Sequence, residues 1–268
     1  MSRVKFSMLL MHFTCVWIDI YFNLLAIPYV MHAAASGYTL GLLALFRVPT
    51  PIIYYFAVVS LFLLGPAIIL FFEDRYHRLA RLDSETKSRH MKRLIYFGFN
   101  YFVSFISILP SFFNIPNAAE AKVHLLQEFP CIPSVIVEKS GFFTLAYDNT
   151  IIVSCLLGYM TFATTQALFF IYRTTIYLSR IKTVSKQTIR LQRQYFKNLV
   201  IQTTVPILIV ATPTTYLNVS AALDYLDMGM NNVAILWLTT HGIFSTVTML
   251  MVHKPYRDAS LGFLVEAC

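Results

Sequence analysis

Six long, mostly apolar stretches run through the chain, with shorter polar segments between them. They cover residues 9–33, 50–72, 94–115, 150–172, 198–222 and 231–252. Each is 22 to 25 residues long, and about 20 residues suffice for a helix to cross the hydrocarbon core of a bilayer. Strands of a membrane barrel would instead alternate apolar and polar positions over about ten residues. The pattern therefore predicts an all-α, polytopic transmembrane bundle of six spans in one domain, 1–268.

Lysine and arginine are concentrated in alternate connecting segments. Segments 1–8, 73–93, 173–197 and 253–268 hold 18 of the 21 basic residues, and the other three are Arg47, Lys122 and Lys139. Basic loops stay on the cytoplasmic side during membrane insertion. We therefore expect these four segments, and with them both ends of the chain, to be cytoplasmic, where they also attract anionic membrane lipid.

The composition agrees with a membrane protein and excludes other classes. Hydrophobic residues make up 57% of the chain and charged residues 13%, against roughly 25% charged in ordinary soluble domains. The net charge of +8 lies in segments that flank the membrane and not on a soluble module, so we expect no nucleic-acid partner.

No catalytic, cofactor or metal signature is present in the sequence. HExxH, GxSxG, P-loop and GxGxxG patterns are absent, and the seven His have no metal-ligand spacing. The four Cys include no CxxC pair, and Cys131 has no second cysteine on its predicted external side to pair with. We expect neither an enzyme nor a bound cofactor.

Two ionisable residues, Asp19 and His241, lie near the middle of their predicted spans. Such groups are costly in lipid and usually face a partner or a water-filled cavity. One hypothesis is a polar hub in which Asp19 and His241 approach each other. The alternative is that Asp19 is protonated or hydrogen-bonded to a neighbour such as Asn23, while His241 is a satisfied core imidazole.

The second span ends in Glu73-Asp74-Arg75-Tyr76-His77. Adjacent carboxylate and guanidinium groups can hold each other, and the arginine can swing to another partner in a second state. Alternatively, Arg75 and Tyr76 simply anchor the membrane edge. The basic segment 173–197 reads as a helical extension of its two flanking spans. It would contact either a cytoplasmic transducer or anionic lipid.

Six short motifs, in order along the chain, resemble one family. They are Met11-His12-Phe13 with Trp17, Asp19 and Ile27-Pro28-Tyr29; Gly37-Tyr38-Thr39-Leu40-Gly41; Phe71-Phe72 with Glu73-Asp74-Arg75-Tyr76-His77; Pro130-Cys131-Ile132-Pro133; Ser185-Lys186-Gln187-Thr188 with Leu191-Gln192 and Ile201-Gln202; and His253-Lys254-Pro255-Tyr256-Arg257. Together they resemble nematode serpentine receptor class H, a family of rhodopsin-like, seven-helix G-protein-coupled chemoreceptors.

This resemblance implies a function in olfaction or another chemical sense. Asp74, Arg75 and Tyr76 would form the receptor's inner switch, with Pro255, Tyr256 and Arg257 in a second motif after the last helix. A heterotrimeric G protein would dock on 173–197. The ligand would be a small environmental chemical that enters from the outer side, and the receptor would lie in the plasma membrane of a sensory cilium.

The chain departs from the family at its start, because its first apolar stretch matches the family's second helix. Either the gene model lacks an upstream exon, or this is a shortened, non-functional receptor copy. A different class, a small transporter or channel subunit, would suit the two midplane ionisable groups. Such a protein would be expected to carry an inverted repeat with Gly-broken helices, and the sequence has none.

Overall fold

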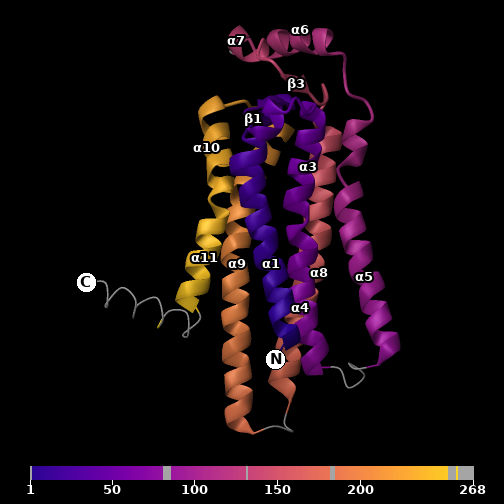
Figure 1. Cartoon of the computed structure of the whole chain (residues 1–268), viewed down its shortest axis with the longest axis vertical. Helices are drawn as coiled ribbons and strands as arrows, with labels where there is room; N and C mark the ends of the chain where they lie inside the picture. Colours follow the sequence, from indigo (N-terminus) through magenta and orange to yellow (C-terminus); the bar gives the residue numbers. More distant parts are fainter. Residues whose placement is uncertain (1, 81–85, 131, 182–184, 253–257, 259–268) are drawn as a thin grey trace, which may run out of the picture.

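Helices that run roughly along one axis make up most of the protein (Figure 1). The computed structural model describes residues 2–80, 86–130, 132–181, 185–252 and 258. In this part of the chain, six helical stretches are long and apolar enough to cross a membrane. They are Phe6–Ala26, Thr50–Leu79, Lys87–Phe112, Thr150–Arg180, Lys186–Ala222 and Met228–Val252. The all-α, multi-pass membrane class follows from these helices.

Several of the spans are built from more than one helical element. The long elements are α1 (Ser2–Ile20), α3 (Thr50–Phe62), α4 (Leu64–Ala80), α5 (Lys87–Ile106), α8 (Thr150–Arg180), α9 (Lys186–Ala222), α10 (Met228–Thr239) and α11 (His241–Val252). A π-helix, η1 (Tyr21–Ala26), continues α1, and a 3₁₀ turn, η3 (Leu109–Phe112), follows α5. Breaks at Leu63 and Thr240 separate α3 from α4 and α10 from α11.

The predicted span 9–33 is wrong beyond Ala26, where the helix ends. Ile27 adopts a left-handed conformation with φ of 40°, and strand β1 (Pro28–Met31) begins directly after it. Pro28 has no amide hydrogen and disfavours helical geometry at the residue before it. Hydropathy could not reveal this boundary, because a short buried strand is as apolar as a helix segment.

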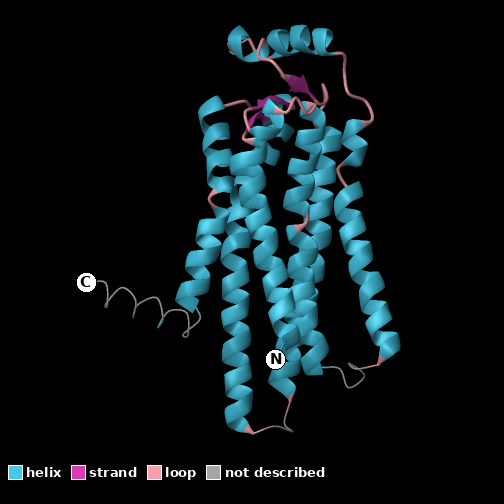
Figure 2. Cartoon of the chain, viewed as in Figure 1, coloured by secondary structure: helices cyan, strands magenta, loops and turns pink. Residues whose placement is uncertain are grey.

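A small antiparallel sheet at one end of the bundle was not predicted (Figure 2). After β1 the chain makes a 3₁₀ turn, η2 (His32–Ala34), and returns as β2 (Ser36–Thr39), which pairs Met31 with Ser36. Strand β3 (Phe143–Thr144) adds to β2, giving the order β1-β2-β3. Gly37 is needed here because a Cβ at that position would lie 2.4 Å from the Tyr29 carbonyl oxygen.

The long connection 116–149 is folded over this sheet. Helices α6 (Ala118–Glu128) and α7 (Ser134–Val137) lie across the end of the bundle (Figure 1). One buried apolar cluster joins them to the hairpin, with Leu125, Ile132 and Val137 against Met31 and Ala34. The short α2 (Leu42–Leu45) follows β2. We call this the capped end of the bundle.

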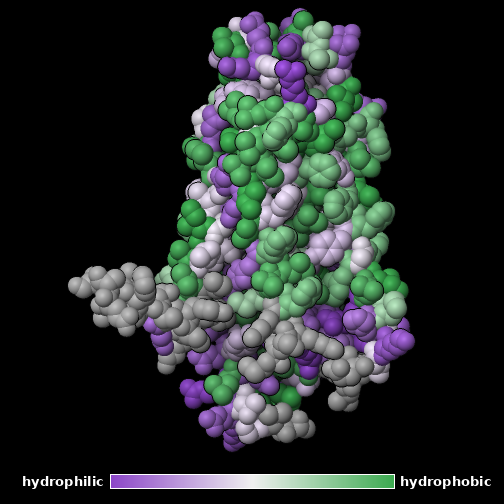
Figure 3. Space-filling model, in the orientation of Figure 1, coloured by the Kyte–Doolittle hydropathy of each residue, from purple (hydrophilic) through white to green (hydrophobic). Residues whose placement is uncertain are grey.

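The opposite end, which we call the basic end, is where α4 and α8 finish and α5 and α9 begin (Figure 1). There the helices run past the apolar stretches, since α8 reaches Arg180 and α9 starts at Lys186. The prediction that 173–197 extends its flanking spans as helix is confirmed on both sides of the loop. Figure 3 shows apolar side chains over the middle of the visible face and hydrophilic ones toward both ends.

The α3–α4 span occupies the centre of the bundle. Two thirds of its most apolar window is buried, 67%, against 33% or less in each of the other five spans. Phe71, Phe72 and Ile69 of α4 are almost fully buried and pack with Ile18 of α1 and Leu199 of α9. Residues at the two ends of this span are therefore positioned by helices on several sides.

Candidate functional site

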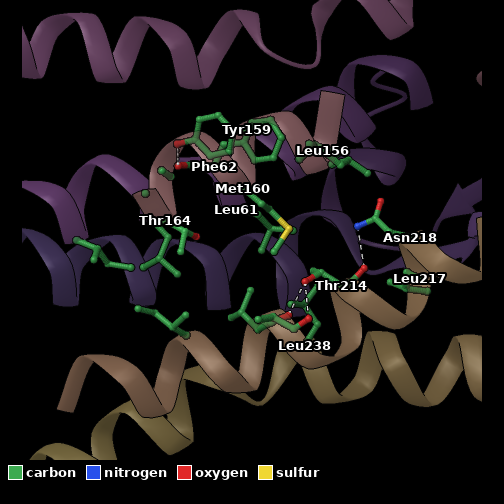
Figure 4. Close-up of a pocket in the computed structure, with 18 of the residues that line it drawn as sticks. Leu61, Phe62, Leu156, Tyr159, Met160, Thr164, Thr214, Leu217, Asn218 and Leu238 are labelled. Atoms are coloured by element: carbon green, nitrogen blue, oxygen red, sulfur yellow. Dashed lines mark hydrogen bonds between the residues drawn. The ribbon is translucent and has the colours of Figure 1, made fainter. Parts of the chain in front are cut away.

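A cavity of about 350 Å³ lies inside the bundle. Residues of α3–α4, α8, α9 and α10 form its walls, and Figure 4 labels ten wall residues from α3, α8, α9 and α10. The η2 turn and β1 contribute at the capped end. Small-molecule sites in proteins usually measure about 300–1,000 Å³. The cavity is therefore large enough for a small organic ligand.

The walls of the cavity are mostly apolar and carry no formal charge. Among the described residues that line it there is no Asp, Glu, Lys or Arg. The one titratable imidazole is that of His32, and burial lowers the pKa of His32 from its ordinary 6.5 to about 4. His32 is therefore neutral near pH 7, and the cavity favours an uncharged ligand.

Most buried polar groups of the wall already have partners within the protein. The Tyr159 hydroxyl donates to the Phe62 carbonyl oxygen at 2.5 Å, and Nδ2 of Asn218 donates to the Thr214 carbonyl oxygen at 2.8 Å (Figure 4). In the described part of the chain, Asn218 Oδ1 and His32 Nε2 have no hydrogen-bond partner. A buried polar atom without a partner costs about 1–3 kcal/mol, so these two atoms are the ones a ligand would satisfy.

The side chains of Asp19 and His241 approach each other, as the hypothesis of a polar hub predicted. Nδ1 of His241 lies 3.3 Å from Oδ1 of Asp19 and 3.1 Å from the Leu238 carbonyl oxygen. Both neighbours are acceptors, so Nδ1 carries the proton. Asn23 does not bind the Asp19 carboxylate. Its Nδ2 donates to the backbone carbonyls of Asp19 (3.1 Å) and Thr239 (3.4 Å).

This contact lies at the break between α10 and α11. Helix α11 begins at His241, and the Asp19 carboxylate lies beside its first turn, where the helix dipole favours negative charge. A Cβ on Gly242 would lie only 1.7 Å from Asp19 Oδ2. Glycine is therefore required at position 242 for the carboxylate to reach the imidazole.

At the basic end, the buried carboxylates of Glu73 and Asp74 form ion pairs with arginine side chains. Arg93 of α5 donates to Glu73 through Nη2 (2.6 Å) and Nε (2.9 Å), and its Nη2 also reaches Asp74 Oδ1 at 3.1 Å. Arg78, one turn along α4, lies 3.0 Å from Asp74 Oδ2. Glu73 and Asp74 are only 2% and 5% exposed, and the two ion pairs of Arg93 fix α5 against α4.

Arg75 reaches across the bundle to a different helix. Its Nη2 donates to the Tyr195 hydroxyl of α9 at 2.6 Å, and its guanidinium carbon lies 4.7 Å from the centre of that ring. Tyr76 accepts a hydrogen bond from Arg173 of α8 at 3.3 Å. Asp74 and Arg75 therefore serve different partners, although they are adjacent. The hypothesis of anchoring alone does not account for these contacts between helices.

Aromatic side chains connect the cavity with these contacts. Phe72 lines the cavity and lies 6.3 Å, ring to ring, from Phe196. Arg75 and Tyr195 belong to the same stretches of α4 and α9 and are bonded to each other. The Phe72–Phe196 pair therefore lies three residues from Arg75 along α4 and next to Tyr195 along α9.

Sequence reasoning missed several residues of these sites. Tyr195 and Arg93 are distant in sequence from 73–76, and nothing in their spacing distinguished them from the other tyrosines and basic residues. Asn218 lies near the end of a predicted span, and nothing in the sequence indicated that it would line a cavity. The second predicted switch motif, Pro255, Tyr256 and Arg257, lies outside the described residues, as does Cys131.

Comparisons with known proteins agree with the predicted resemblance. A family model described as "Serpentine type 7TM GPCR chemoreceptor Srh" matches residues 1–266. A curated relative, "Serpentine receptor class H-72" of Caenorhabditis elegans, is 30% identical over 169 residues. That alignment covers 59% of this chain and 46% of the relative. The matched region is thus just under half of that receptor's length.

Proposed function

Since the chain belongs to the Srh family of serpentine seven-transmembrane chemoreceptors, we propose that it detects a small environmental chemical and signals to a heterotrimeric G protein. The ligand occupies the cavity within the bundle, and the G protein docks at the basic end. The family is one of receptors and not of enzymes, so the chain's role is to report binding by a change of shape.

One observation carries this proposal: the cavity and the Arg75–Tyr195 contact share the same two helices. Phe72 belongs to the cavity wall and packs on Phe196, and the bonded pair Arg75 and Tyr195 lies nearby on the same helices. A ligand shifts a conformational equilibrium only as far as it prefers one arrangement over the other. We expect ligand contact with Phe72 to supply such a preference, because Phe72 lines the cavity and packs on Phe196 of α9.

The helical extensions of α8 and α9 form the proposed docking surface. Arg193 holds them together by donating to the carbonyl oxygens of Leu178 (2.6 and 2.9 Å) and Ser179 (3.3 Å). This contact satisfies the exposed carbonyls at the end of α8. Lys186 and Arg190 of α9 are exposed and available to a partner.

The test is a ligand-evoked G-protein response in cells that express the chain. Arg75→Ala is expected to abolish the response while surface expression is retained. Lys92→Ala, which removes an exposed basic residue at the same end, should leave it intact. A response that survives Arg75→Ala would reject the role of Arg75. Solute flux that persists when G proteins are blocked would favour a transporter instead.

We also propose, from the family, that the receptor lies in the plasma membrane of a sensory cilium. A fluorescently tagged chain expressed in sensory neurons tests this directly. Accumulation at the ciliated ending is the expected result, and retention in an internal membrane would contradict it.

A further inference from the structure

The cavity is long relative to its volume of about 350 Å³. Its wall includes positions from Leu156 to Ile171 on α8 and from Thr204 to Asn218 on α9. Each of these stretches corresponds to roughly 20 Å of helix at 1.5 Å per residue. A space of this length and volume fits a narrow, elongated molecule better than a compact one.

The two ends of the cavity differ in chemistry. The buried polar atoms left without partners in the described chain, Asn218 Oδ1 and His32 Nε2, belong to the capped end. The opposite end is closed by apolar side chains such as Phe72 and Ile171. An occupant with a single hydrogen-bonding group at one end and an aliphatic chain at the other matches this arrangement.

The cavity also opens through the side of the bundle. Thr164 and Leu168 of α8 and Thr204 of α9 line it, and all three are exposed at the surface, Leu168 by 58%. The mouth therefore lies between α8 and α9, within the apolar part of both spans, and exposed neighbours such as Phe169 and Leu208 are apolar. At the capped end, the hairpin, α6 and α7 lie across the bundle (Figure 1).

We infer that the ligand is an elongated, uncharged molecule with one hydroxyl head group and an aliphatic chain, which enters from the bilayer between α8 and α9. The hydroxyl donates to Asn218 Oδ1, and the chain extends along the cavity toward Phe72. This inference rests on the proposed receptor function and specifies its ligand class. Entry from the bilayer differs from the route that the family resemblance implied, which was entry from the outer side of the membrane.

The experiment uses the full chain in lipid nanodiscs and 1-dodecanol that carries a photoreactive diazirine on its terminal carbon. The expected labelling maps to the α4 and α8 peptides around Phe72 and Ile171. Unlabelled 1-alkanols, compared at equal concentration in the membrane, should compete up to a limiting chain length and fail beyond it. Labelling confined to lipid-facing residues, or competition by butanol equal to that by dodecanol, would overturn the inference.

Two variants test the head group and the mouth. Asn218→Leu should weaken competition by the alcohol roughly threefold to tenfold, since one neutral hydrogen bond is lost. Leu168→Trp should slow labelling on the order of tenfold, within the range that mutations change association rates. Leu208→Trp is the matched control, because Leu208 is 57% exposed on α9 but does not line the cavity.

Equal labelling rates for Leu168→Trp and Leu208→Trp would exclude the lateral route. If Leu168→Trp does not fold, Leu168→Ala widens the same mouth and must speed labelling. G-protein activation is measured separately in the same nanodiscs. Specific labelling with no G-protein response to any bound alcohol would reject the proposed function and retain this inference. A G-protein response to a compact, water-soluble compound, without labelling by the alcohol, would reject this inference and retain the proposed function.

Discussion

Arg75 of α4 donates a hydrogen bond to the hydroxyl of Tyr195 on α9, 2.6 Å away, with its guanidinium over the same ring. The neighbouring carboxylate of Asp74 is bound by Arg78 and Arg93. The residues that sequence reasoning grouped as one switch thus belong to three separate sets of contacts. Asp74 belongs to the contacts that fix α5 to α4, Arg75 joins α4 to α9, and Tyr76 joins α4 to α8 through Arg173.

Replacing Tyr195 with Phe should raise basal G-protein activation. The substitution removes the hydroxyl but keeps the ring beneath the guanidinium. Tyr195 is 40% exposed, so water competes for this bond and its net contribution is about 0.5–1.5 kcal/mol. Its loss should shift the resting equilibrium by roughly threefold to tenfold. Basal activation is measured at equal surface expression, with Tyr172→Phe as control because Tyr172 is 64% exposed on α8. Unchanged basal activity would show that this contact does not restrain the resting state.

Replacing Arg93 with Met should strongly destabilise the protein. It leaves the Glu73 carboxylate, 2% exposed, without its partner, and breaking a buried ion pair from one side costs about 3–5 kcal/mol. Thermal unfolding of the purified protein measures the effect, and Lys92→Met, at an exposed neighbour, should be nearly neutral. Adding Glu73→Gln to Arg93→Met should recover much of the loss. No recovery would mean that Arg93 acts mainly through Asp74.

Replacing Gly242 with Ala should separate Asp19 from His241. The new Cβ would occupy the place of the carboxylate, 1.7 Å from Oδ2, and forced repacking costs about 1–3 kcal/mol. Gly98 of α5 is the matched control, since a Cβ there meets nothing within 4 Å. Gly98→Ala should stabilise its helix by about 0.5–1 kcal/mol. Equal unfolding temperatures for the two variants would exclude the close packing of Asp19 against α11.

Lowering the pH should destabilise the capped end through His32. Its pKa is about 4 when folded and 6.5 ordinarily, so between these values only the unfolded state holds the proton. The contribution of neutral His32 to the free energy of unfolding is therefore fully present above pH 6.5. It is lost as the pH is lowered toward 4, and the loss is at most about 3 kcal/mol. Unfolding measured from pH 7 to pH 4 should show this slope, and His32→Phe should flatten it. A slope that persists in His32→Phe would assign the effect to other groups.

The positions of the membrane helices were largely predictable, because lipid requires long runs of apolar residues. Asp19 and His241 could also be singled out from the sequence as ionisable residues within apolar spans, and the structure brings the two together. The end of the first helix could not be predicted from hydropathy, because residues 27–33 are apolar although they do not continue the helix. They pack as a hairpin beneath α6 and α7, where Met31 and Ala34 join the cap's buried cluster.

Composition and hydropathy, read from the sequence by itself, determined the membrane class, the order of the spans and the placement of basic residues between them. These properties depend on local transfer free energies, which each segment carries with it. Only the tertiary structure decided that Arg75 meets Tyr195, that Arg93 meets Glu73, and that Asn218 and His32 belong to one cavity. Such contacts depend on how helices distant in sequence rotate and pack against one another, and the spacing along a single helix does not contain that information.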